Sequence, residues 1–440
     1  MNNDWVEKQW RGAPLGDKRL EKRAIKIGEA CLKTPDGTLP EKLGCWANTK
    51  GAYRFFDSSQ VSHGALQEIH NKNVIETASA SSQLVLFIQD GSELIYNKHP
   101  HTNGLGPTAD AFGQGIMFHT CLAVEWSKNS PPEILGIAKQ TPWIRPETKD
   151  DKVQKEKESW IWLNTLKAIG RPPVNSQWVS VGDRGNDIYE YIVGAMGEDW
   201  DYVLRAKHDR AIIVGEDKKH LHAWVRSLAP AGEYVLDLRS RGENFSRQAT
   251  LKIAWKMAIM LPPKGKKGEA VPVTYLRVWD PEDEDLEWIL VTSLPVNSAE
   301  EALRIVQIYE HRWIIEEYHK CLKTGCRIED AQLRTGERLL ALLGILGVIA
   351  TQLLRLRDLS RQQPDRPAEE VVAKEIIAVV KSKYKLDGVI SLKELWRRIA
   401  MLGGFLGRKS DGNPGWQTIW KGWLRIQDLL EGMTLAKNCG

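Results

Sequence analysis

From about residue 84 the sequence alternates between short apolar runs and segments with helical spacing. The runs LVLFIQD (84–90) and QWVSVGD (177–183) are apolar along most of their length and each ends in an aspartate, as expected for buried strands. KEKESWIWLNTLKAIG (155–170) and NDIYEYIVGAM (186–196) have the pattern of helices. Strands that alternate with helices predict an α/β fold, in which a mixed sheet is flanked by helices.

Further strands are expected on both sides of these helices. They are predicted at ELIYN (93–97), GIMFHTCLAVEW (115–126), EILGIAKQTPWIR (133–145) and DYVLRAK (201–207). From about 208 to 285 strand-like segments (EYVLDLRS, ATLKIAWKMAIML and VTYLRVWD) follow one another without helices, which predicts a β-rich insertion. EWILVTSLPV (287–296) resumes the pattern of a core strand. Ser298 and Glu301 then form a capping box for a long helix that we expect to reach about Thr324.

Both ends of the chain have helical spacing. A loop at TPDGTLPEKLG (34–44) separates a helical segment from a second helix expected at 51–72, and the first segment carries Lys18, Arg19 and Arg23 on its polar faces. A basic helical face can be solvated surface or a DNA contact. The predicted domains are a helical domain at 1–71, a catalytic α/β domain with its insertion at 72–365, and a helical domain at 366–440.

Composition narrows the cellular setting. No stretch approaches about 20 continuous apolar residues and the N-terminus lacks a signal peptide, so we expect a cytoplasmic protein with no membrane partner. The six cysteines form no CxxC pair and are predicted to be free thiols. A net charge of +4 in 440 residues is too small to identify a nucleic-acid-binding protein by itself.

Two aspartates stand at the ends of predicted strands. If the strands are neighbours, Asp90 and Asp183 meet at one edge of the sheet, where ligands of open α/β sheets gather. Two close carboxylates repel, and a divalent cation such as Mg²⁺ or Mn²⁺ relieves that repulsion. The alternative is structural, because each aspartate could instead cap a helix or close a turn.

The long predicted helix adds a third carboxylate. Tyr309, Arg312, Glu316, Lys320 and Lys323 are spaced by three, four, four and three residues, which places them in one stripe of the helix. A solvated face could have the same spacing. The rest of this helix is rich in apolar residues, however, so a buried polar stripe would need a polar partner such as metal ions and phosphates.

These residue types suit phosphodiester chemistry. Two metal ions about 3.5–4 Å apart can activate a water or 3′-hydroxyl and stabilise the leaving oxygen. Asp90, Asp183 and Glu316 would hold two such ions. Arg312, Lys320 and Lys323 would bind flanking phosphates. Arg205, which ends the strand-like DYVLRAK, is predicted to point toward the same edge.

The spacing Tyr309-x2-Arg312-x3-Glu316-x6-Lys323 resembles the signature of bacterial DDE transposases of the fourth insertion-sequence family. The resemblance covers almost the whole chain. Its other motifs are LGDKR (15–19), GAYRF (51–55), IQD (88–90), KESW (157–160), DRGNDIYEY (183–191), LRAKH (204–208), EWILVTSLPV (287–296) and LGGFLGRKSDGNPGWQTIWKGW (402–423). The sequence departs from the family within DRGND and in the loop that follows Asp90.

This resemblance implies a ribonuclease-H-like catalytic core with Asp90, Asp183 and Glu316 as the catalytic and metal-binding triad. It also implies cut-and-paste transposition through a DNA hairpin, with recognition of the transposon end by the N-terminal helices. The C-terminal helices would form a homodimer within a synaptic complex that joins the element to target DNA. Trp288 would accept a flipped base with help from Trp313, and base stacking contributes about 1–3 kcal/mol per base.

Two other functions fit parts of the sequence. A ribonuclease-H-like nuclease would cut DNA without joining it, and it would need neither helical end domain. A DNA-binding regulator would need no triad. Cleavage and joining of a labelled transposon end separate the three possibilities.

Overall fold

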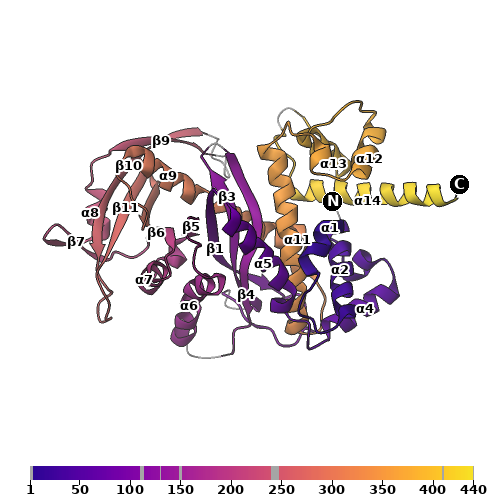
Figure 1. Cartoon of the computed structure of the whole chain (residues 1–440), viewed down its shortest axis with the longest axis horizontal. Helices are drawn as coiled ribbons and strands as arrows, with labels where there is room; N and C mark the ends of the chain where they lie inside the picture. The colour runs from indigo at the N-terminus through magenta and orange to yellow at the C-terminus, as the bar shows by residue number, and fades with distance from the viewer. Residues whose placement is uncertain are drawn as a thin grey trace.

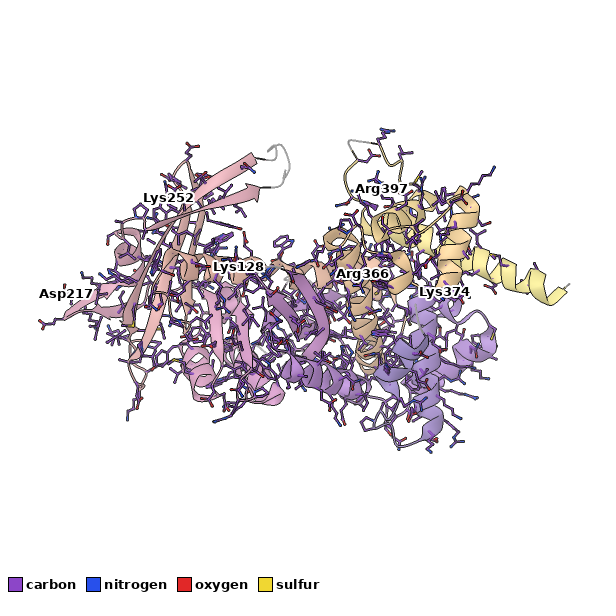
Figure 2. The ribbon with its side chains drawn as sticks, turned by 45° about the horizontal axis from the view of Figure 1, so that its top comes forward. Lys128, Asp217, Lys252, Arg366, Lys374 and Arg397 are labelled. Atoms are coloured by element: carbon purple, nitrogen blue, oxygen red, sulfur yellow. The ribbon has the colours of Figure 1, made fainter. Side chains whose placement is uncertain are left out.

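The computed structural model describes residues 3–109, 113–128, 130–147, 151–238, 247–408 and 411–439. The molecule is elongated, with a central sheet between two different ends (Figure 1). The β-rich insertion lies at one end, and the N-terminal and C-terminal helices lie together at the other. Charged side chains cover both ends, for example Lys252 on the insertion and Arg397 on a C-terminal helix (Figure 2).

Five helices precede the sheet. They are α1 (Asn3–Trp10), α2 (Lys18–Lys33), α3 (Leu39–Leu43), α4 (Trp46–Phe56) and α5 (His63–Ala80). The loop predicted at 34–44 contains the short helix α3, because Thr38 and Glu41 form a reciprocal capping box at its start. The single helix predicted at 51–72 is wrong. The chain leaves α4 after Phe56 and restarts at α5, where the Ser62 hydroxyl accepts a hydrogen bond from the Ala65 amide.

The central sheet has the strand order β4-β3-β1-β5-β6. Its strands are β1 (Leu84–Ile95), β3 (Gln114–Ser127), β4 (Ser130–Trp143), β5 (Gln177–Gly182) and β6 (Asp201–Arg205). β3 pairs antiparallel with both β1 and β4, while β5 and β6 run parallel to β1. The short β2 (Gly106–Pro107) pairs with β3. This arrangement is the predicted ribonuclease-H-like sheet.

One strand is longer than expected. The separate strands predicted at 84–90 and 93–97 form a single strand, β1, which stays paired to β3 as far as Ile95. Its pairing to β5 stops at Ile88, opposite Val181, because β5 ends at Gly182 and turns into the 3₁₀ turn η1 (Arg184–Asn186). Asp90 therefore lies within a strand, at the point where one of its two neighbours ends.

The insertion continues the same sheet. It contains β7 (Ala211–Val214), β8 (Asp217–His220), α8 (Leu221–Arg226), β9 (Gly232–Leu238), β10 (Arg247–Met260) and β11 (Val271–Asp280). The short helix α8 corrects the expectation of strands alone. β12 (Asp283–Thr292) follows the insertion and includes the first part of the core strand predicted at 287–296. β12 pairs antiparallel with β6 and joins these strands to the core. The strand predicted at 233–240 falls partly outside the described residues. The sheet pairings of the rest agree with a β-rich segment between the two core regions.

The two faces of the sheet have separate cores. Along β1, Leu86 and Ile88 belong to one apolar cluster, whereas Val85 and Phe87 belong to the other. The second cluster lies under α6 (Asp151–Ile169) and α7 (Tyr189–Gly197) and includes Trp178 and Trp200 around Phe87. α10 and α11 pack against the first cluster, while α5 contributes Leu66 to the first and Val74 and Ala78 to the second.

The long helix predicted from Ser298 to about Thr324 is interrupted. It consists of α9 (Ala299–Glu310), α10 (Trp313–Lys320) and a π-helical turn, η2 (Cys321–Gly325). Between α9 and α10, the amides of His311 and Arg312 bond the carbonyls three residues earlier, which tightens the turn. Ser298 caps α9, because its hydroxyl accepts a hydrogen bond from the Glu301 amide. The predicted capping box is not closed, because the Glu301 carboxylate accepts from the Asn297 amide instead of the Ser298 amide.

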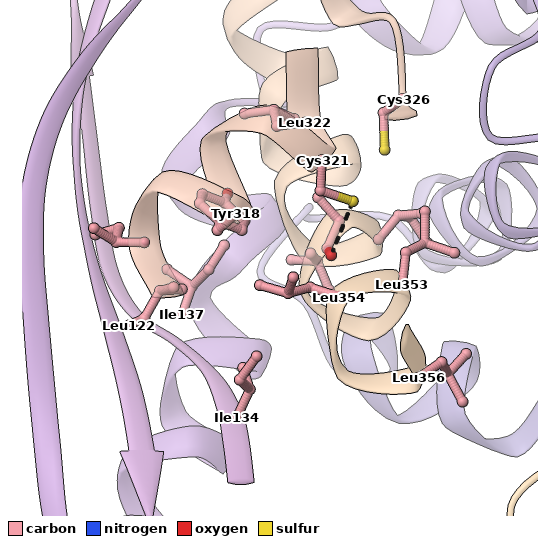
Figure 3. Close-up of a cluster of buried hydrophobic side chains, with 14 of the residues drawn as sticks. Leu122, Ile134, Ile137, Tyr318, Cys321, Leu322, Cys326, Leu353, Leu354 and Leu356 are labelled. Atoms are coloured by element: carbon pink, nitrogen blue, oxygen red, sulfur yellow. Dashed lines mark hydrogen bonds between the residues drawn. The ribbon is translucent and has the colours of Figure 1, made fainter. Parts of the chain in front are cut away.

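α11 (Gly336–Gln362) is the central helix of the core. Its length and hydropathy meet the criteria for a membrane-crossing helix, which corrects the expectation that no segment approaches them. In its most apolar window 83% is buried within the protein, as in the core helix of a folded domain. Figure 3 shows Leu353 and Leu354 of α11 beside Cys321 and Leu322 of η2.

η3 (Ile328–Asp330) precedes α11, and four helices follow it: η4 (Ala368–Glu370), α12 (Lys374–Tyr384), α13 (Leu392–Leu402) and α14 (Trp416–Cys439). α13 packs against α11, and α12 and α14 pack against α13. Trp396 of α13 stacks on Trp423 of α14 with 5.7 Å between ring centroids. The five cysteines whose side chains are described are free, as predicted.

Candidate active site

Two of the predicted carboxylates lie side by side across two parallel strands. Ile88 of β1 is opposite Val181 of β5, so Asp90 and Asp183 each follow two residues later. Because side chains alternate along a strand, both aspartates point to the face that carries Ile88 and Val181. Neighbouring strands are about 4.8 Å apart, which places the two carboxylates close together.

The neighbourhood of Asp90 disfavours its charge. Burial, followed by the charge of Asp183, raises the pKa of Asp90 to about 7, although Arg312 and the Gly91 amide act in the opposite direction. Glu316 adds to the increase. The Asp90 carboxylate therefore lies within electrostatic reach of both other triad members. A cation placed between them would favour the ionised form.

Glu316 reaches this face from α10. The side chain is half-buried and forms an ion pair with Arg312, one turn earlier. Burial opposes the charge of Arg312, but the hydrogen bond to Glu316 and nearby negative groups raise its pKa above the ordinary value. Among the described residues, no three acidic, histidine or cysteine side chains are gathered tightly enough to hold a metal ion without movement. Glu316 would have to exchange Arg312 for the metal.

Metal binding can be judged from the donors themselves. Asp90, Asp183 and Glu316 offer hard carboxylate oxygens, which Mg²⁺ and Mn²⁺ prefer. The pKa of Asp90 is raised by burial first and by the neighbouring charge of Asp183 second, and a bound divalent ion would offset both effects by stabilising the ionised carboxylate. These residues fit such an ion.

A basic and aromatic group surrounds the carboxylates. Arg205, at the end of β6, forms a hydrogen bond with Tyr309, and burial lowers the pKa of its guanidinium. Burial raises the pKa of the Tyr309 phenol, while the nearby charge of Arg312 lowers it and that of Asp183 raises it. The ring of Trp288 contacts Tyr309 edge to face at 5.6 Å between centroids. One continuous group of side chains, called here the wall, therefore lies beside the aspartates. It consists of Arg205, Trp288, Tyr309 and Arg312.

Other predicted residues lie outside this group. Trp313 is 51% exposed and lines a separate groove of about 790 Å³ that also contains Arg361. Lys320 is exposed and Lys323 is half-buried. The π-helical turn η2 widens the helix at Lys323, so the regular spacing of the stripe does not extend to this residue.

The three N-terminal basic residues lie on α2, at the opposite end of the molecule from the insertion (Figure 1). Lys18 is exposed, and Arg19 forms an ion pair with Asp17, the N-cap residue of α2. Arg23 is half-buried and lies directly over Gly51, where a β-carbon would be 2.9 Å from its guanidinium carbon.

The sequence did not single out several residues that adjoin the site. The imidazole of His319 lies 4.0 Å from the Asp90 carboxylate, and its position three residues after Glu316 was an available clue. Arg184 directly follows Asp183 and is near enough to influence Arg205. The side-chain amide of Gln89 on β1 donates a 3.0 Å hydrogen bond to the Ser180 hydroxyl of β5, and no sequence motif predicts this contact.

Three family models match the chain. The model for "Transposase DNA-binding" matches residues 2–61, that for "Transposase DDE domain" matches 162–353, and that for "Transposase Tn5 dimerisation domain" matches 348–440. Asp183 and Glu316 fall within the DDE match, and Asp90 precedes it. Among solved structures, the cryo-EM structure of the piggyBac transposase synaptic complex with hairpin DNA is similar at 10% identity. That alignment covers 95% of this chain and 72% of that chain, with a TM-score of 0.37.

Proposed function

The chain belongs to the DDE transposases and has a Tn5-type dimerisation domain, and from this premise we propose that it moves its element by cut-and-paste transposition. As a DDE transposase it is a metal-dependent DNA endonuclease and strand transferase. In the proposed reaction it binds the inverted repeats at the element's ends, cuts them through a hairpin intermediate and joins them to target DNA. The reaction would take place in the bacterial cytoplasm, on the nucleoid.

The proposal rests mainly on the register of β1 and β5. It sets Asp90 beside Asp183 on the face that α10 covers, and Glu316 comes from α10. We assign these three carboxylates as the catalytic and metal-binding triad for two Mg²⁺ or Mn²⁺ ions. When bound, the ions would lower the pKa of the attacking water or 3′-hydroxyl and stabilise charge on the leaving oxygen.

The wall beside the triad would hold the DNA strand. Arg312, once released from Glu316, and Arg205 carry planar guanidinium groups suited to the phosphates next to the scissile bond. Tyr309 would orient both arginines. Lys320 and Lys323 would extend the phosphate contacts along the same helix. Trp288, already in edge contact with Tyr309, would stack on a base displaced from the duplex, with the exposed Trp313 assisting.

The helical ends would supply recognition and assembly. Lys18, Arg19 and Arg23 lie within the DNA-binding match and would contact the transposon end. The C-terminal helices lie within the dimerisation match. We propose that two copies pair two ends in a synaptic complex, and that each copy cuts the end bound by the other.

A strand-transfer assay tests the proposal. Labelled DNA carrying the inverted repeat that flanks the gene is incubated with the protein, Mg²⁺ and target plasmid, and we expect nicked, hairpin and joined products in order. D90N, D183N and E316Q should abolish cleavage and retain end binding, because they remove charge without changing shape. Nicking without joining would instead support a nuclease, and a shifted but uncut band would support a regulator.

A further inference from the structure

α10 is a short helix between two irregular turns. It has eight residues, with the tightened turn at His311 and Arg312 before it and the π-helical turn η2 after it. A regular helix would transmit its orientation through continuous hydrogen bonds, but α10 is interrupted at both ends. Its rotation about its own axis must therefore be fixed by its side chains.

Those side chains reach different partners. The Tyr318 hydroxyl accepts a 3.0 Å hydrogen bond from Gln140 of β4, and His319 packs on Phe118 of β3. These contacts hold α10 against the sheet. On the side of α11, Glu317 forms an ion pair with Arg357.

Arg357 is unusual for its burial. Its side chain is 5% exposed, in the C-terminal part of α11, and it also bonds the Asp358 carboxylate at 2.7 Å. A buried guanidinium needs close anionic partners, so it and Glu317 constrain each other's positions strongly. Glu317 directly follows Glu316, about 100° around the helix. Any rotation that breaks the Glu317–Arg357 pair also moves the Glu316 carboxylate.

We propose that Arg357 and Glu317 are positioning residues that set the direction of Glu316 toward Asp90. The proposal rests on the assignment of Glu316 to the triad. It also links two regions, because Arg357 lies within the dimerisation match and Glu317 within the DDE match. A movement of α11 in the dimer would be passed to the triad through this ion pair.

The same helix provides a matched control. Arg355, two residues before Arg357, forms an ion pair with Glu133 at the start of β4. R355Q removes an arginine ion pair from the same part of α11. It leaves Glu317 and Arg357 in place.

The experiment measures Mn²⁺ binding to the full-length protein by electron paramagnetic resonance, alongside cleavage of end DNA. E317Q and R357K should weaken Mn²⁺ binding and lower the cleavage rate, each by about 10-fold or more, the usual effect of removing a group that orients a metal ligand. Affinity for end DNA should not change. R355Q should match the wild type in all three measurements.

Two results would overturn the proposal. One is Mn²⁺ binding in folded E317Q and R357K that equals binding in R355Q. The other is an equal loss in R355Q, which would indicate general loosening of α11. If circular dichroism shows that E317Q is unfolded, Mn²⁺ binding is compared between R357K, which keeps the positive charge, and R355Q. A wild type that binds no Mn²⁺, or an E316Q variant that still cleaves, would count against the proposed function instead.

Discussion

The acidity of Asp90 has a measurable consequence for folding. With a pKa of about 7 in the folded state and an ordinary value of 3.8, Asp90 holds a proton in the folded protein that the unfolded chain has released. Between pH 4 and 7 the folded state therefore binds more protons. The contribution of Asp90 to the free energy of unfolding falls as pH rises through this window.

We predict that D90N removes this loss. In EDTA, the free energy of unfolding of the wild type should fall between pH 4 and pH 7 by on the order of 4 kcal/mol more than that of D90N. Urea unfolding at each pH measures the difference. Addition of Mg²⁺ should erase the difference in slope, because the ion replaces the proton. Parallel pH profiles for the two proteins in EDTA would show that Asp90 is not held protonated by its surroundings.

Lys320 offers a test of DNA contact. It is exposed and lies one turn after Glu316. If it neutralises a phosphate, K320A should reduce the slope of log affinity against log salt by about 0.9, since one fewer counterion is released. Filter binding over a salt series measures this slope. K374A, at an exposed position at the start of α12, is the control, and a K320A slope identical to that of K374A would exclude the contact.

At the scale of elements, Gln140 joins the N-terminal helices to the catalytic core. Its amide oxygen receives hydrogen bonds from His63 and Gln67 of α5, and its amide nitrogen donates to Thr120 of β3 and Tyr318 of α10. All these groups are buried. One side chain therefore ties α5, the sheet and α10 together.

Replacement of this amide by an apolar group should be costly. Q140L would leave several buried polar groups without partners, and we predict a loss of about 3 kcal/mol or more in the free energy of unfolding. Urea unfolding at pH 7 provides the measurement. Q83L, at the exposed entry to β1, should change stability little. A Q140L protein as stable as Q83L would mean that the network contributes nothing.

The sequence pattern predicted the two strands that carry Asp90 and Asp183, for a physical reason. Buried strands need continuous apolar runs, and LVLFIQD and QWVSVGD have them, so their adjacency placed Asp90 and Asp183 on one edge. The continuation of β1 beyond Asp90 was not predictable in this way. Its extra residues pair only with β3, and they include Gly91, which weakens a strand pattern.

The division of the catalytic helix was also invisible in the sequence. Residues 299–324 keep helical spacing throughout, and the dihedral angles of His311 and Arg312 stay helical, so no breaker residue marks the turn. Packing decides it, because α9 and α10 have to cover different parts of the sheet. Periodicity therefore placed Glu316 on a helix. It could not predict that α10 depends on Glu317 and Arg357 for its orientation.

At the scale of the whole molecule, a set of buried and half-buried histidines affects how stability depends on pH. Burial lowers the pKa of His63 and His311 to about 4, and that of His70, His119 and His319 to about 3. Each therefore binds a proton more readily in the unfolded chain. Stability from these groups is complete above pH 6.5 and falls as the pH drops toward the folded pKa, opposite in sign to the effect of Asp90.

His70 is the member that joins the N-terminal region to the sheet. Its Nδ1 lies 2.6 Å from the Gln9 amide oxygen of α1, and its Nε2 accepts the Ile137 amide of β4 at 3.0 Å. This pairing fixes the neutral tautomer with the proton on Nδ1. A second proton on Nε2 would remove the acceptor for Ile137 and place a charge in a fully buried position.

Acid should therefore separate the N-terminal helices from the catalytic sheet. At pH 5 a histidine with an ordinary pKa of 6.5 and a folded value near 3 costs about 2 kcal/mol. H70Q cannot titrate, so its loss of stability between pH 7 and pH 5 should be smaller than that of the wild type by this amount. Urea unfolding at the two pH values measures the difference, and H101Q, at an exposed site, is the control. Equal losses in H70Q and H101Q would mean that His70 accepts its second proton without disturbing the contact between α1 and β4.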